Sequence, residues 1–200
     1  MPAAATLLKA VAKEAASCTL CPLYRNATQT VFGEGAARAP IMLVGEQPGD
    51  QEDLAGHPFV GPAGKVLDRA MAEAGLDRKK VYLTNAVKHF KNEPRGKKRL
   101  HKRPNRYEVE VCRVWLRQEI SLVKPQLILA LGVTAAMALA GRPVVLSRER
   151  GKVIELADGQ LGMVTTHPSS ILRMPDQKGR HAAFAGLVKD LKAAAKQAAA

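Results

Sequence analysis

The sequence predicts an α/β protein, a three-layer α/β/α sandwich with a central, mainly parallel sheet. Three short apolar runs, at 41–44, 81–84 and 126–131, are typical of buried strands. Segments with apolar residues at helical spacing, 63–74 and 107–122, precede the second and third of these runs. Alternation of helices and strands along a chain favours a parallel sheet that helices cover on both faces.

The other predicted elements are terminal or short. Their patterns indicate helices at 3–16, 134–140 and 179–196, and strands at 153–156 and 161–165. The two strands form a hairpin or two edge strands around the turn Asp158-Gly159. Two hundred residues without an internal repeat predict a single domain, 1–200. No apolar run approaches the ~20 residues of a membrane span, and no secretory signal is evident, so we expect a cytoplasmic protein with no membrane partner.

Basic residues dominate the charge of the chain. There are 31 Lys and Arg against 18 Asp and Glu, a formal net charge of +13, which favours a nucleic acid or another polyanion as partner over a merely basic surface. Nine of the basic residues lie between Lys88 and Arg106, where Pro94 and Gly96 interrupt regular structure. We therefore expect a basic loop at about 90–106 whose cations are free to bind phosphates, the alternative being a solvated loop.

The three cysteines, Cys18, Cys21 and Cys112, are too few for a disulfide framework. A Cys-x-x-Cys pair by itself is half a metal site, a redox dithiol or two ordinary thiols. Cys112 adds a third thiolate, and His89, just beyond a predicted strand, is the best candidate for a fourth ligand. Such a ligand set favours an iron–sulfur cluster, with a structural zinc ion as the second possibility.

Polar side chains follow the predicted strands at their carboxyl ends, the edge at which open parallel sheets bind ligands. Glu46 and Gln47 lie in the turn Gly45–Gly49, Asn85 ends the second strand, and His167 follows the strand at 161–165. Solvated turn residues are the commoner explanation for each one alone. As functional groups, Asn85 matches the carbonyl and imide N–H of a pyrimidine such as uracil, and His167 can donate a hydrogen bond to a leaving base.

Two further side chains have a possible functional role. Phe59 lies in the Gly- and Pro-rich segment 56–64 before a helix, where it is either an ordinary core residue or a ring that stacks on a flat base. His101 lies within the basic run 97–103, and a nucleophilic imidazole surrounded by positive charge suits chemistry on a polyanion.

These motifs together resemble the iron–sulfur branch of the uracil-DNA glycosylase superfamily over about residues 15–190. The matching segments are Cys18-x-x-Cys21, GEQPG at 45–49, GHPFVGPAG at 56–64, TNAVK at 84–88, Cys112 and HPSSILR at 167–173. Gln47, His89 in place of a cysteine, and a basic loop ending in KRLH resemble more narrowly the UdgX group, which couples covalently to uracil-containing DNA. That group has more nearly KRRIH in the loop, so Leu100 is a conservative departure.

The resemblance implies excision of uracil from DNA, preferably single-stranded, followed by linkage of His101 to C1′ of the abasic deoxyribose in a single turnover. His167 stabilises the leaving uracil, Glu46 stabilises C1′ or accepts a proton, and the basic neighbours keep His101 neutral. The residues implied to bind substrate are Gly45, Gln47, Phe59, Asn85, Lys98, Arg99 and Ser169, and those implied to hold a [4Fe-4S] cluster are Cys18, Cys21, His89 and Cys112. The alternatives are a conventional multiple-turnover glycosylase, in which His101 only binds phosphate, and a noncatalytic iron–sulfur DNA-binding module. A monomer is expected.

Overall fold

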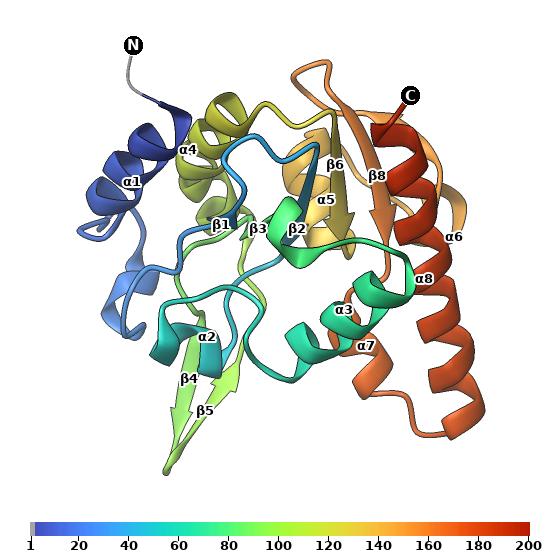
Figure 1. The fold of residues 1–200 in the computed structure, drawn as a ribbon. Coiled ribbons are helices and arrows are strands. Elements are labelled where there is room, and N and C mark those ends of the chain that lie inside the picture. Colours follow the sequence, from blue (N-terminus) through green and yellow to red (C-terminus); the bar gives the residue numbers. More distant parts are fainter. Residues whose placement is uncertain (1–2) are drawn as a thin grey trace.

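The computed structural model describes residues 3–200 and contains a six-stranded sheet with the strand order β1-β3-β2-β6-β8-β7 (Figure 1). The four central strands run parallel: β3 (Tyr82–Asn85), β2 (Ile41–Gly45), β6 (Leu127–Leu131) and β8 (Leu161–Thr165). The edge strands, β1 (Glu34–Gly35) and β7 (Val153–Glu155), pair antiparallel with their neighbours. The predicted mainly parallel sheet is confirmed, and β7 and β8 form a hairpin, one of the two arrangements predicted for them.

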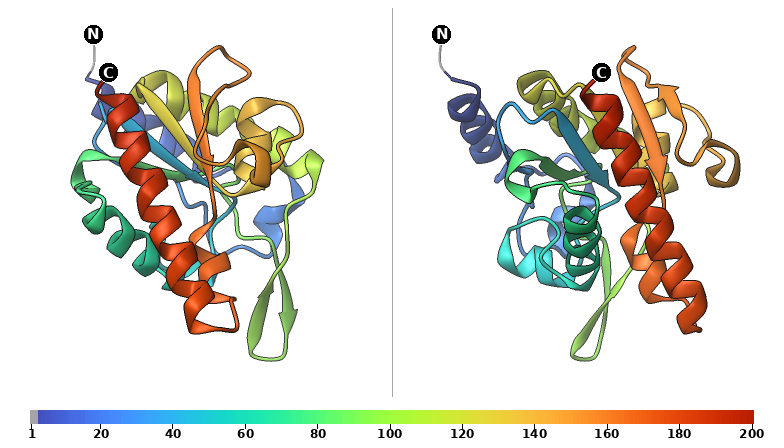
Figure 2. Two further views of the ribbon diagram at one scale, coloured as in Figure 1. Left: turned by 90° about the vertical axis from the view of Figure 1, so that its right-hand side faces the viewer. Right: turned by 45° about the vertical axis from the view of Figure 1, so that its right-hand side comes forward.

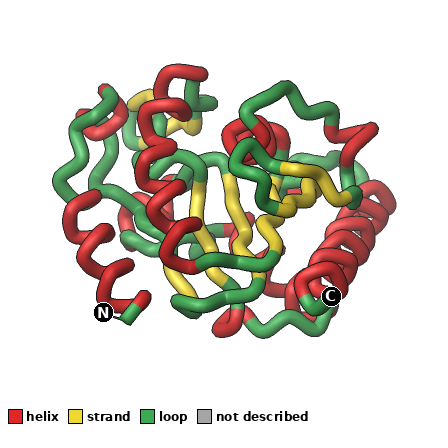
Figure 3. The backbone as a smooth tube through the Cα atoms, turned by 90° about the horizontal axis from the view of Figure 1, so that it is seen from above, coloured by secondary structure: helices red, strands yellow, loops and turns green. Residues whose placement is uncertain are grey.

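Helices cover both faces of the sheet (Figure 3). One face packs against α3 (Pro62–Glu73), α7 (Pro168–Leu172) and α8 (Gln177–Ala198), and the other against α1 (Ala4–Ala15), α4 (Arg106–Val123) and α5 (Val133–Ala140). In β2, Leu43 faces the first layer while Met42 and Val44 face the second. Because both faces are buried, the strands are continuous apolar runs. Within residues 3–200, no helix is long and apolar enough to cross a membrane.

The predicted basic loop is wrong in its structure, because its central part is an antiparallel hairpin. Strands β4 (Asn92–Arg95) and β5 (Lys98–His101) project from the body of the protein (Figures 1 and 2). Gly96 has a φ of +59°, which suits the first position of a two-residue type II′ turn. Pro94 is tolerated because every strand of a two-stranded hairpin is an edge strand.

Besides β1, α7 and the hairpin, four further short elements were not expected from the sequence. They are α2 (Asp50–Ala55), α6 (Leu146–Glu149) and the 3₁₀ turns Pro22–Arg25 and Arg78–Lys80. Each is too short to contain a full amphipathic period. The first of them matters for the site, because α2 directs the carboxylate of Asp53 into the protein, where the residue is fully buried.

Candidate functional site

The carboxyl ends of β2, β3 and β8 bring four of the predicted site residues together. Gly45 and Asn85 are partners in the parallel register of β2 and β3. A Cβ atom on Gly45 would collide with Asn85 Oδ1 and lie 2.8 Å from Phe59 Cζ. The ring of Phe59 lies 6.5 Å from that of His167, with an angle of 32° between the planes. Glycine at position 45 therefore provides the space in which an amide and two rings meet.

Phe59 has a backbone conformation that non-glycine residues rarely adopt. Its φ is +57°, and its side chain is buried. The guanidinium of Arg78 donates to the carbonyls of Pro58 (3.1 Å) and Phe59 (3.5 Å), and a Cβ atom on Gly64 would collide with the Phe59 carbonyl. Strain of this kind persists where surrounding contacts enforce it, which is common at ligand sites.

The hydrogen bonds of His167 define where its proton lies. Nδ1 accepts from the Ser169 backbone N–H at 3.1 Å and lies 2.7 Å from Ser169 Oγ, so the neutral ring carries its hydrogen on Nε2. Burial, with Arg173 and His101 adding to it, lowers the pKa of His167 to about 4. His167 is therefore a neutral hydrogen-bond donor near pH 7. Ser169 was predicted to bind substrate, but its amide and hydroxyl both contact His167 instead.

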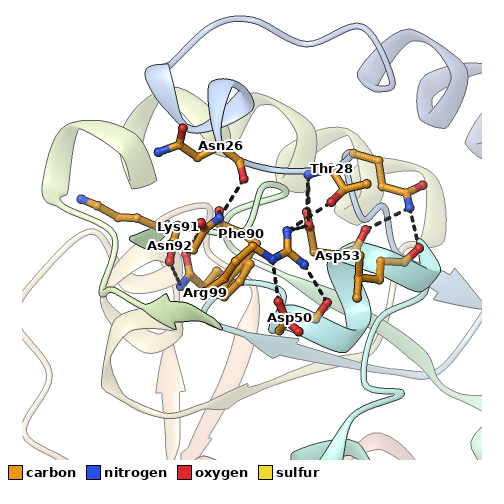
Figure 4. Close-up of polar contacts among 11 residues, drawn as sticks. Asn26, Thr28, Asp50, Asp53, Phe90, Lys91, Asn92 and Arg99 are labelled. Atoms are coloured by element: carbon orange, nitrogen blue, oxygen red, sulfur yellow. Dashed lines mark hydrogen bonds and ion pairs between the residues drawn. The ribbon is translucent and has the colours of Figure 1, made fainter. Parts of the chain in front are cut away.

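Arg99 fixes the hairpin to the body of the protein (Figure 4). Its Nε donates to Asp50 Oδ1 at 2.7 Å, and its Nη1 donates to Thr28 Oγ1 at 3.1 Å and to the carboxylate of the buried Asp53. Both oxygens of that carboxylate also accept from the Thr28 backbone N–H at 3.0 Å. The prediction that Arg99 binds phosphate is not supported, because its guanidinium is occupied by two carboxylates from α2.

Strand alternation places His101 on the same face of β5 as Arg99, although the His101 side chain is 52% exposed and Lys98 is exposed as well. The Nε2 of His101 lies 2.9 Å from Gln47 Nε2 and 3.7 Å from Glu46 Oε1. Gln47 is oriented by the backbone, since its Oε1 accepts from the Lys91 N–H at 3.0 Å and its Nε2 donates to the Lys102 carbonyl at 2.9 Å. Because Gln47 Nε2 can only donate, His101 Nε2 must be the acceptor. The lone pair of His101 Nε2 therefore points at the Gln47 amide, and Glu46 Oε1 lies 3.7 Å from the same nitrogen.

The basic neighbours are not the main reason that His101 is neutral, contrary to the sequence prediction. Burial is the largest cause that lowers the pKa of His101, Arg173 adds to the effect, and Glu46 opposes it. Several cations of the basic run are paired elsewhere. Lys91 pairs with Glu108 at 2.8 Å and Lys102 with Glu93 at 2.6 Å. The expectation of a run of free cations is thus wrong for these residues.

Lys88, expected at the start of the basic loop, is fully buried behind the site. Its Nζ donates to Glu119 Oε2 at 2.5 Å and to the Asn85 carbonyl at 2.8 Å. Glu119, also fully buried, accepts from the Gly33 N–H at 2.8 Å and from the Tyr82 hydroxyl at 3.2 Å. Burial and Glu119 raise the pKa of Tyr82, which keeps the phenol a donor. This buried ion pair holds the end of β3 in place.

The three cysteines lie in one apolar cluster with Val87 and Trp115. Trp115 Nε1–H donates to Cys18 Sγ and the Lys88 backbone N–H donates to Cys112 Sγ, each at 3.2 Å. Burial raises the pKa of Cys21, and raises that of Cys112 to about 12. Within residues 3–200, no three His, Cys, Asp or Glu side chains are spaced to hold one metal ion. Thiolates are ligands of both iron–sulfur clusters and zinc ions, and two of the three thiols accept N–H···S hydrogen bonds of the kind that surround such sites.

His89 follows Lys88 directly and is buried. Burial lowers its pKa, with Asp53 acting in the opposite direction, so its imidazole is neutral, the form that binds metals.

Sequence reasoning missed the groups that hold the site in place. Asp50, Asp53, Arg78 and Glu119 contact the predicted residues without belonging to a motif, and Arg173, the last residue of HPSSILR, was given no role. The only available indication was the acidic run that follows GEQPG.

These groups gather at the carboxyl edge of the sheet. α/β proteins that bind flat ligands have their sites at such an edge. The profile described as the uracil DNA glycosylase superfamily matches residues 32–192, and the chain belongs to that superfamily.

Curated relatives agree with this membership. The type-4 uracil-DNA glycosylase of Pyrobaculum aerophilum is 39% identical over 170 residues, covering 82% of this chain and 83% of the relative. That of Thermotoga maritima is 37% identical over 168 residues, covering 84% of each chain. That of Archaeoglobus fulgidus is 36% identical over 172 residues, covering 82% of this chain and 83% of the relative.

Proposed function

We propose that the protein excises uracil from DNA, preferably single-stranded, and then links itself covalently through His101 to the abasic deoxyribose. Membership of the superfamily supports uracil excision. The observation that carries the covalent step is the contact of His101 with Gln47, which keeps Nε2 unprotonated and holds it 3.7 Å from Glu46.

Excision uses the groups at the carboxyl edge of the sheet. The target base is extruded into the site, Phe59 stacks on the uracil ring, and the Asn85 amide hydrogen-bonds its edge. As the N-glycosidic bond breaks, its electron pair moves to uracil N1. The neutral His167 donates from Nε2 to the developing anion, and the carboxylate of Glu46 stabilises the cationic character of C1′.

In the covalent step, the hydrogen bond from Gln47 to His101 Nε2 breaks, and the released lone pair forms the bond to C1′. The resulting imidazolium loses its Nδ1 proton to water, and the uracil anion takes up a proton from solvent. Glu46 faces Nε2, which carries no hydrogen, so its role is electrostatic rather than that of the proton acceptor suggested by the sequence. Imidazole is a poor leaving group, and the protein is therefore consumed in one turnover.

The direct test mixes the protein with a single-stranded oligonucleotide that contains one uracil and separates the products on a denaturing gel. We expect a shifted band that survives boiling in detergent and is absent when thymine replaces uracil. Alkali-labile DNA without a shifted band would identify a conventional glycosylase. If neither product forms, the protein is a noncatalytic DNA-binding module.

Gly45→Ala is expected to slow uracil excision, because the new Cβ would displace the Asn85 amide and the Phe59 ring. Displacement of a positioning group by about 1 Å can reduce a rate by about 10²-fold. Single-turnover excision measures this effect, and the exposed Lys65→Ala in α3 serves as the control. An unchanged rate in Gly45→Ala would contradict the placement of uracil between Asn85 and Phe59.

Arg99→Ala is expected to slow formation of the adduct by about 10²-fold, because the hairpin is no longer anchored to Asp50 and Asp53 and His101 is no longer held near C1′. Uracil excision should change much less. Saturating DNA separates this effect from DNA binding, and Lys97→Ala in the hairpin turn is the matched control. If Arg99→Ala reduced uracil excision and adduct formation equally, Arg99 would not act specifically by positioning His101.

The pH dependence of the adduct reports the protonation of His101. Because its pKa is lowered, the ring stays neutral at pH values where an ordinary histidine becomes protonated, about 6.5. The rate of adduct formation should stay constant from pH 8 to about 6.5 and fall only below that pH. In His101→Ala, excision should persist to lower pH, because the pKa of His167 is about 4. A fall in adduct formation above pH 7 would contradict the neutral nucleophile.

We also propose that Cys18, Cys21, His89 and Cys112 hold a [4Fe-4S] cluster. When bound, it would link the N-terminal segment to α4 and the segment after β3, a structural role. Iron and acid-labile sulfide in the purified protein are expected, with loss of both in Cys112→Ser. A protein that contains zinc and no iron would overturn this assignment.

A further inference from the structure

A groove between α4 and α5 lies beside the catalytic groups and has no part in the chemistry described above. It has a volume of about 750 Å³, where the beginning of α4 packs beside α5 (Figure 2). Val109, Met137 and Ala138 contribute apolar surface to it. Guanidinium groups line the same groove, and they belong to Arg103, Arg106, Arg113 and Arg142. Apolar surface flanked by cations suits a nucleotide, which is flat and apolar at the base and anionic at the phosphate.

Arg113 has donors that the protein does not satisfy. Its side chain is only 14% exposed, and its nearest charged partner is Glu110, at 3.6 Å from Nη1 to Oε1. Among residues 3–200, its guanidinium makes no hydrogen bond, although it carries five N–H groups. Among the described residues, none of the Arg113 nitrogens is both fully buried and without a partner, so its N–H groups reach solvent and can donate to a ligand in the groove.

Arg103 joins the groove to the catalytic site. Its Nε donates to Thr134 Oγ1 at 3.0 Å, and Thr134 lines the groove. The same nitrogen lies 3.8 Å from Glu46 Oε2. Arg106 is exposed and has no ion-pair partner in the described part of the chain. A ligand can thus extend from Glu46 along the groove toward a cation that is free to bind it.

Charge also favours a nucleic acid strand in this groove. Phosphates close to the extruded uracil require cations, but Lys91, Arg99 and Lys102 of the basic run are paired with carboxylates. Arg106, Arg113 and the terminal nitrogens of Arg103 are nearby guanidinium groups with donors to offer. Arg142 is committed to Glu149, at 2.6 Å.

We propose that the groove between α4 and α5 binds the single-stranded DNA that continues from the extruded uracil, with a base against Met137 and a phosphate at Arg106 and Arg113. This groove extends the proposed uracil-binding site, and its assignment rests on the proposed function.

The first test measures binding of a labelled oligothymidylate of ~15 nucleotides, which needs no chemistry. Arg106→Glu and Met137→Glu are each expected to weaken binding by about tenfold. The log–log slope of the salt dependence should fall by about 0.7 for each phosphate that a variant no longer binds. Arg117→Glu is the matched control, because Arg117 lies on the same helix, is 55% exposed and does not line the groove. If Arg117→Glu weakened oligothymidylate binding equally, the effect would come from the net charge of the protein and not from the groove, and the proposal would be overturned.

The second test places the strand relative to uracil. Oligonucleotides extended on only the 5′ or only the 3′ side of one uracil are compared at subsaturating concentration. In the native protein, extension on one side should accelerate product formation, and the groove variants should lose that advantage. An unchanged advantage, or displacement of oligothymidylate by an equal concentration of thymidine monophosphate, would overturn the proposal. If no uracil product forms while the groove variants still lose oligothymidylate binding, the proposed function fails and the groove assignment stands.

Discussion

His101→Ala is expected to abolish the covalent adduct while uracil is still excised. The groups that stabilise the leaving base are Asn85, at the end of β3, and His167, at the start of α7; neither lies on the hairpin, so bond cleavage does not depend on the His101 imidazole. Removal of the side chain opens space beside Glu46 for water. The variant should then release uracil and leave an alkali-labile site, which gel electrophoresis with and without alkali measures.

His181→Ala provides the control, because this histidine is exposed on α8. It should form the adduct at the native rate. An adduct that persists in His101→Ala would end the assignment of the nucleophile. Peptide mapping of the native adduct gives an independent result, with the DNA remnant expected on the peptide that contains residue 101.

Glu119→Ala should lower the free energy of unfolding by about 3–5 kcal/mol, since removal of one partner leaves the charge of Lys88 buried and uncompensated. The Gly33 N–H and the Tyr82 hydroxyl lose their acceptor as well. In a chain of this size the midpoint of thermal unfolding should fall by about 10 °C. Denaturant and thermal unfolding measure the loss.

The control for this change is Glu110→Ala on the same helix, a residue whose side chain is 67% exposed. It should alter stability by no more than about 0.5 kcal/mol. Combining Glu119→Ala with Lys88→Met should recover part of the loss, because the buried charge is then removed with its partner. A loss below about 1 kcal/mol in Glu119→Ala would contradict the importance of the pair.

The sheet was predictable because burial on both faces imprints a continuous apolar run on each central strand, as at 41–44. The hairpin was not, since β4 and β5 are polar, contain Pro94 and depend on contacts with distant residues. Arg99 illustrates the difficulty: its partners Asp50 and Asp53 lie 49 and 46 positions away. A basic motif indicates a polyanion site, but the motif alone cannot distinguish cations that meet DNA from those paired internally.

The resemblance to a family supplied the candidate residues, and the geometry changed the roles of several. Gln47 had the least certain role in the sequence. Its backbone contacts now give it one, because they determine which imidazole nitrogen carries the lone pair. The neutrality of His101 was attributed to its neighbours in sequence, whereas burial and Arg173 from the C-terminal part of the chain account for it.

Arg99 and His101 are two residues apart and therefore share one face of β5. The chemistry consequently depends on whether a change in the length of the hairpin is by an odd or an even number of residues. Deleting Lys98, the strand residue between the turn and Arg99, would exchange the two faces of β5, so that Arg99 and His101 would both leave the face that carries their contacts with the body of the protein. Insertion or deletion of two residues keeps Arg99 and His101 on their original face of the strand. Evolution of this loop should therefore tolerate insertions of two residues more readily than insertions of one, and the same constraint applies to any grafting of the hairpin onto a related enzyme.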